Sequence, residues 1–145
     1  MKVVRQYILD YVLIVTVILL SIAGFWKIFF GADARPTTYH YLHVITVFAW
    51  LLLLLIQLTL IGKKSFLSHK TVGLSILLFG PLLVASTALM SVHSARKGMI
   101  SGEGDALLVQ NVMGTLELGF LILMGFVLRK RRAIHGAFLL STTLL

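Results

Sequence analysis

The chain has 145 residues, of which 59% are hydrophobic and 12% charged, and its formal net charge is +8. A soluble domain carries about 25% charged residues, and half that share cannot cover the surface of a water-soluble globule. The composition therefore excludes a soluble enzyme, a DNA-binding domain and a disordered chain, and it predicts an integral membrane protein. The chain has no cysteine, which excludes disulfides and thiolate metal sites.

Spanning helices need about 20 mainly apolar residues. Four segments meet this length, at residues 7–30, 38–62, 71–94 and 106–128. A fifth apolar run, residues 134–145, would form only about 18 Å of helix against about 30 Å of hydrocarbon, so it cannot span. We expect it to begin a longer helix in a chain that continues past Leu145. The predicted fold is an all-α polytopic transmembrane helical bundle, a single domain over residues 1–145 with four full spans and the start of a fifth.

The distribution of basic residues predicts the orientation, because Lys and Arg accumulate on the cytoplasmic side of membrane proteins. Nine lie on one side of the predicted bundle: Lys2, Arg5, Lys63, Lys64, Lys70, Arg129, Lys130, Arg131 and Arg132. Four lie on the other side: Lys27, Arg35, Arg96 and Lys97. The N-terminus is therefore expected in the cytoplasm. Short basic runs between apolar stretches are a topology signal, so no nucleic-acid partner is expected.

All five histidines lie near predicted helix ends. His40, His43 and His93 form an outer group, and His69 and His135 form an inner pair. One interpretation is structural, with the rings capping helix ends or bonding headgroups. A second is axial ligation of haem b by His43 with His93 and by His69 with His135, which requires two rings at one depth on different helices.

A third interpretation of the outer histidines is a transition-metal site. His40, His43 and His93 could ligate zinc or copper, with Glu103 or Asp105 as an oxygen ligand. The sequence does not choose among the three interpretations.

The second predicted helix carries a polar stripe. His43, Trp50 and Gln57 are seven residues apart and share one helical face. A polar group facing lipid would be left without a partner, so this face should point into the bundle. Trp50 and Gln57 are therefore candidate cofactor-binding residues beside the histidines.

Glu117 lies in the middle of the fourth predicted helix. An ionised carboxylate without a partner is costly at that depth. Glu117 is therefore a candidate catalytic residue, as a proton-relay or quinone-contacting acid. The structural alternative is a neutral interhelical hydrogen bond, with Gln57 as the first candidate partner.

Several of these residues carry a resemblance to a family. The sequence resembles uncharacterised bacterial inner-membrane proteins in the histidine–tryptophan–glutamine helix, in an H-[KR]-x-x-G turn and in a second histidine-containing turn. The matching positions are His43, Trp50, Gln57, His69, Lys70, Gly73, Pro81 and, within residues 131–140, His135. The resemblance implies a multi-pass protein of the bacterial inner membrane. A looser likeness to cytochrome b561-type bundles implies haem held by histidines.

Two functions follow from these features. The leading hypothesis is a redox-associated membrane protein that holds haem b or a metal between helices. The alternative is a non-catalytic membrane subunit that binds lipid or quinone, packs against other membrane subunits or a second copy, and has structural histidines. Whether the protein is an enzyme stays open.

Overall fold

The computed structural model describes residues 7–101 and 104–145, except for the side chains of residues 97, 100, 101 and 105. Lys2, Arg5 and Glu103 lie outside the described residues, as do the side chains of Lys97 and Asp105. Every regular element in the described ranges is helical, which confirms the all-α prediction. The elements are α2 (Ile8–Phe30), α3 (Thr38–Gly62), α4 (Phe66–Gly73), α5 (Ile76–Ser101), α6 (Gly104–Val127), α7 (Arg132–Ser141) and the 3-10 helix η1 (Thr142–Leu144).

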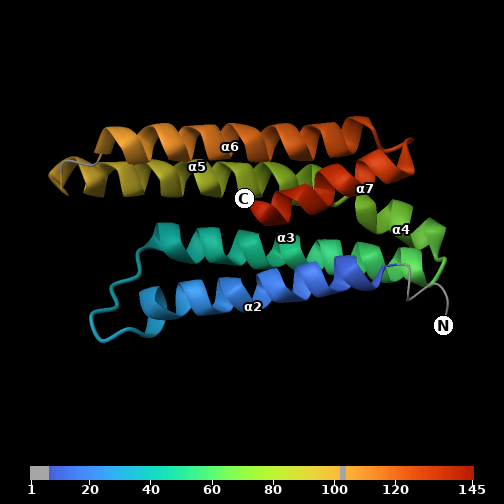
Figure 1. Cartoon of the computed structure of the whole chain (residues 1–145), viewed down its shortest axis with the longest axis horizontal. Helices are drawn as coiled ribbons and strands as arrows, with labels where there is room; N and C mark the ends of the chain where they lie inside the picture. The colour runs from blue at the N-terminus through green and yellow to red at the C-terminus, as the bar shows by residue number, and fades with distance from the viewer. Residues whose placement is uncertain (1–6, 102–103) are drawn as a thin grey trace.

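The long helices run along the length of one bundle. Figure 1 shows α2 beside α3 and α5 beside α6, and contacts between α3 and α5 join the two pairs. The short α7 follows α6, turns back along it and ends near the middle of the bundle.

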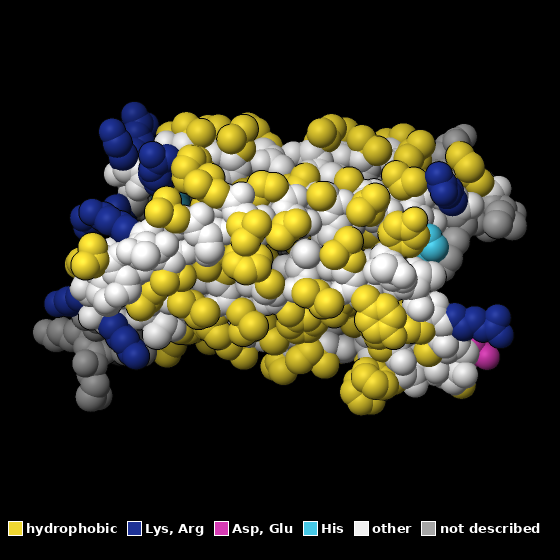
Figure 2. All heavy atoms as spheres, turned by 180° about the vertical axis from the view of Figure 1, so that it is seen from behind, with side chains coloured by type: hydrophobic (Ala, Val, Ile, Leu, Met, Phe, Trp, Pro, Cys, Tyr) yellow, Lys and Arg dark blue, Asp and Glu magenta, His cyan; other side chains and the backbone are white. Residues whose placement is uncertain are grey.

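Four helical segments are long and apolar enough to cross a membrane, which confirms the predicted number of spans. They are Ile8–Phe30, Thr38–Gly62, Ile76–Arg96 and Ala106–Val127. Figure 2 shows hydrophobic side chains covering the middle of one face while Lys and Arg gather at the two ends. This arrangement fits an apolar slab with water on both sides. The protein is a multi-pass membrane protein.

The predicted third span begins too early in the chain. Residues 66–73 form the separate helix α4, and α5 begins at Ile76. Between them the Leu74 amide donates to the Thr71 carbonyl at 3.3 Å, and the Ser75 hydroxyl donates to the Val72 carbonyl at 2.6 Å. These short-range bonds capture carbonyls that a continuous helix would use, so the chain turns before it enters the span.

The fifth apolar run does not span the bundle, as expected. It forms α7 and η1, which together cover Arg132 to Leu144. Leu139 packs so closely on α6 that a Cβ atom at Gly125 would lie 2.6 Å from its Cδ2 atom. Glycine therefore lets α7 lie against α6.

The core lies between α3, α5 and α6. Its buried members are Trp50, Leu53, Leu54, Leu58, Ile76, Leu83, Leu118 and Ile122, together with Ile14 from α2. Within α2, Ile14 is the buried residue and much of the remaining surface is exposed and apolar. Such a helix is stable only where its outer face meets lipid.

One end of the bundle, here called the basic end, carries Lys63, Lys64, Lys70, Arg129, Lys130, Arg131 and Arg132. We predict that it faces the cytoplasm. A reporter enzyme that is active only outside the cytoplasm should be silent when fused after Lys64 or Lys130, and active when fused in the loop near Asp33. Strong activity at Lys64 would reverse the orientation.

Candidate functional site

The outer histidines come from two helices that meet at one end of the bundle. His40 and His93, from α3 and α5, contact each other edge to face with ring centroids 5.5 Å apart. The Tyr39 ring also contacts His93, with ring centroids 5.1 Å apart. Two members of the predicted outer group are therefore in contact, and the ring that meets His93 is that of His40 and not of His43.

His40 closes the start of α3. The Thr37 amide donates to its Nδ1 at 3.1 Å, in a capping box where the ring supplies the acceptor. Because Nδ1 accepts, the hydrogen of the neutral ring lies on Nε2. A metal ion binds a ring nitrogen that carries no hydrogen and makes no other bond. With these hydrogen bonds, His40 does not fit the role of third ligand in the predicted metal site.

His43 lies one turn deeper and faces other partners. Its ring contacts Phe25 of α2 at 6.2 Å, and its Nδ1 is 3.5 Å from the Ser86 hydroxyl. Ser86 also bonds Thr46 at 2.6 Å, which links α3 to α5 through buried hydroxyl groups. This small network was not foreseen from the sequence.

His93 differs from the other histidines. Its Nε2 atom is buried and has no hydrogen-bond partner in the described part of the chain. A buried nitrogen without a partner is costly, and it suits a ligand donor atom. In residues 7–101 and 104–145, however, no three His, Asp or Glu side chains lie close enough to hold one metal ion.

The inner group is built around Gln57. Its amide has one orientation that satisfies all its neighbours: the oxygen accepts from the Gly73 amide at 2.9 Å, and the nitrogen donates to the His69 carbonyl at 3.1 Å and to His69 Nδ1. Gln57 thus fixes both ends of the His69–Gly73 turn to α3. Gln57, His69 and Gly73 thus form one hydrogen-bonded junction.

His135 lies opposite His69. The two rings are 6.5 Å apart and nearly perpendicular. His135 Nδ1 is 2.6 Å from the Gly125 carbonyl, which can only accept, so Nδ1 carries the hydrogen and Nε2 is bare. His69 has the opposite arrangement, because its Nδ1 accepts from Gln57 and its Nε2 carries the hydrogen. The inner pair therefore does not fit two axial haem ligands in this arrangement, since both would need a bare nitrogen.

Burial lowers the pKa of His69, and the neighbouring His135 lowers that pKa further. A Gln57 amide oxygen facing Nδ1 would raise the pKa instead, but the Gly73 amide already holds that oxygen on the other side. The junction therefore favours neutral His69.

Trp50 is 2% exposed and confirms that the polar stripe of α3 points into the bundle. Its Nε1 donates to the Thr142 hydroxyl at 2.9 Å. This bond joins the middle of α3 to the start of η1, directly after α7, across 92 positions of sequence.

The predicted bond between Glu117 and Gln57 is wrong. Gln57 is occupied by His69 and Gly73, and Glu117 is exposed on the outside of α6. α6 instead turns Leu118 and Ile122 into the core. Glu117 precedes Leu118 by one residue, about 100° around the helix, and this rotation leaves the carboxyl group outside.

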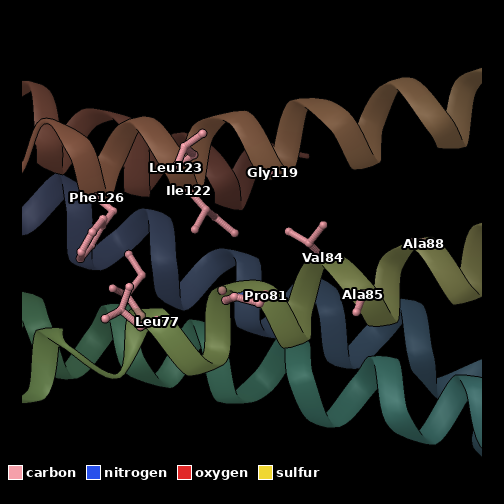
Figure 3. Close-up of a pocket in the computed structure, with 11 residues that line it drawn as sticks. Leu77, Pro81, Val84, Ala85, Ala88, Gly119, Ile122, Leu123 and Phe126 are labelled. Carbon is pink, nitrogen blue, oxygen red and sulfur yellow. The ribbon is translucent and has the colours of Figure 1, made fainter.

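A lateral groove of about 400 Å³ runs between α5 and α6. Figure 3 shows it between Leu77 and Phe126 at one end and Ala88 at the other. Its complete lining is Ile76, Leu77, Gly80, Pro81, Val84, Ala85, Ala88, Gly119, Ile122, Leu123 and Phe126. Leu77 and Leu123 are 56% and 58% exposed, so the groove opens sideways.

No histidine lines this groove, nor a second groove between α6 and α7. The sequence interpretation missed the first groove because its lining residues are all apolar and carry no chemical signature. The available signal was the set of small residues Gly80, Ala85 and Ala88 on the third span opposite Gly119 on the fourth. Small residues facing each other normally bring two membrane helices into close contact. Gly80 does so here, because a Cβ atom at this position would lie 2.9 Å from Ile122 Cγ2, and the groove opens along the side of this contact.

Comparisons with family models, with curated proteins and with solved structures find no match to this chain.

Proposed function

We propose that the protein is a non-catalytic membrane subunit that holds the apolar chain of a membrane lipid or an isoprenoid quinone in the α5–α6 groove. The sideways-opening apolar groove carries this proposal. A channel exposed to the hydrocarbon of a bilayer fills with apolar chains, and one long chain matches its narrow, uniformly apolar lining. The bonded histidines at helix ends support the structural interpretation of those residues.

The test compares bound chains in matched variants. Protein purified in mild detergent should carry about one lipid or quinone, measured by mass spectrometry of an organic extract against the protein amount. A Cβ atom at Gly119 would make ordinary contact with Val84 at 3.8 Å, so a side chain can begin there without a clash. Because Gly119 lines the groove, we expect the ring of Gly119→Phe to occupy it. We expect this variant to lose most of the bound chain.

Gly24→Phe is the control. A Cβ atom at Gly24 would meet nothing within 4 Å, and this residue of α2 lies outside the groove lining. It should retain the wild-type amount of bound chain. Equal retention by Gly119→Phe and Gly24→Phe would refute the proposal, and the class of molecule extracted would distinguish lipid from quinone.

A redox function remains the second candidate, and the buried, unpartnered Nε2 of His93 favours it. Haem b would supply one-electron transfer, with His93 as a candidate ligand at the outer end. An absorption spectrum with and without dithionite decides between the candidates. Haem bands that disappear in His93→Ala would support the redox function, whereas a spectrum without haem bands after expression with added haem would reject it.

A further inference from the structure

The α5–α6 groove ends at a positive charge. Phe126 closes it at the basic end, and the Arg129 guanidinium carbon lies 4.4 Å from the centre of the Phe126 ring. The Arg129 Nη1 atom also approaches the Phe126 carbonyl at 3.5 Å. The aromatic face therefore positions the guanidinium at the mouth of the groove.

Arg129 is exposed and has no carboxylate partner among the described residues. The described part of the basic end holds seven Lys and Arg residues and one carboxylate, Asp10. A guanidinium stacked by its face keeps N–H donors at its edge, where they can bind a phosphate group through two bonds. The mouth is therefore complementary to an anionic headgroup.

The length of the groove agrees with one acyl chain. Its α5 residues run from Ile76 to Ala88, a rise of about 18 Å. One leaflet supplies about half of the roughly 30 Å hydrocarbon core. A phospholipid in the leaflet at the basic end would therefore have its headgroup at Arg129 while its chain follows the groove as far as Ala88.

We propose that the groove takes an anionic glycerophospholipid, with its phosphate on Arg129 and one acyl chain along α5 and α6. This inference rests on the proposed function and names the ligand of the same groove. A quinone has a neutral headgroup and would leave the cation at the mouth unpaired.

Trp50 provides a local probe of the groove. A Cβ atom at Gly80, in the groove wall, would lie 3.9 Å from Trp50 Cζ3, so the indole lies directly behind the wall and is 2% exposed. Brominated acyl chains quench tryptophan only at short range. Trp26 is 59% exposed and would respond to bulk lipid, so it is removed with Trp26→Phe.

The Trp26→Phe protein is reconstituted into vesicles of unlabelled phosphatidylcholine with a rising fraction of brominated phosphatidylglycerol or brominated phosphatidylcholine. We expect phosphatidylglycerol to quench Trp50 at a severalfold lower fraction. Arg129→Gln should shift the phosphatidylglycerol curve about fivefold toward the phosphatidylcholine curve, the effect of one basic residue at a membrane surface.

Arg132→Gln is the matched control. It removes the same charge at the same end, but Arg132 lies over Phe66, 5.6 Å from that ring, and not over the groove. Its phosphatidylglycerol quenching curve should stay close to that of the Trp26→Phe parent. Equal shifts in both variants, or equal quenching by both lipids in the parent, would overturn the headgroup site while leaving the chain site intact. An absence of quenching by either lipid would refute the proposed function itself.

Discussion

Trp50→Ala should destabilise the protein by about 3–5 kcal/mol, the usual cost of removing a large aromatic side chain from a packed core. Trp50 is 2% exposed and packs among the residues shared by α3, α5 and α6. The substitution also leaves the Thr142 hydroxyl without the indole donor, so η1 loses its bond to α3. The measurement is the free energy of unfolding during titration of detergent micelles with sodium dodecyl sulfate, followed by circular dichroism.

Two milder variants separate packing from hydrogen bonding. Trp50→Phe keeps most of the bulk and loses the N–H donor. Thr142→Val removes the acceptor and leaves a buried indole N–H unpaired, which costs about 1–3 kcal/mol. In the double variant the two costs should not add, and the coupling between them should be about 1 kcal/mol. Strict additivity would show that the 2.9 Å bond between α3 and η1 contributes nothing.

Acidification should loosen the basic end through His69. Burial and then His135 lower the pKa of His69 in the folded protein below the unfolded value of about 6.5. Between these two values the unfolded chain binds more protons, so stability rises with pH in that window. The contribution of His69 is fully present above about pH 6.5 and is lost as the pH falls through its folded pKa.

The Gln57 amide donates to His69 Nδ1 and would face a second donor once the ring is protonated, so this contact opposes protonation alongside burial and His135. The sodium dodecyl sulfate concentration at the midpoint of unfolding of the wild type should therefore decrease as the pH is lowered from 7 to 5. His69→Gln cannot titrate, so the variant should show a weaker pH dependence. The difference between the two proteins is the quantity that reports His69. Identical pH profiles would contradict the assignment.

The sequence by itself determined the features that depend on local composition. Hydropathy located four spans, because about 20 apolar residues are needed wherever a helix crosses hydrocarbon. It also showed that residues 134–145 are too few to span. The positions of His40 and His93 near one set of helix ends, and of His69 and His135 near the other, followed from the alternation of spans, and both ring pairs are in contact.

The periodicity of α3 also sufficed to point Trp50 into the bundle, because a helix with one polar stripe has only one favourable rotation. The sequence did not predict the hydrogen-bond partners of that stripe. Gln57 could have bonded Glu117 or the turn after α3, and only the packed structure shows that it bonds His69 and Gly73.

Tertiary structure alone decided the rotation of α6 and the path of the chain after it. α6 is apolar on nearly every side, so its hydropathy pattern does not specify which face meets α5. The combined packing of Leu118 and Ile122 with α3 and α5 specifies it, which leaves Glu117 outside and opens the groove beside Gly119. The bond from Trp50 to Thr142 is of the same kind, because a contact across 92 positions exists only once α7 has folded back on α6.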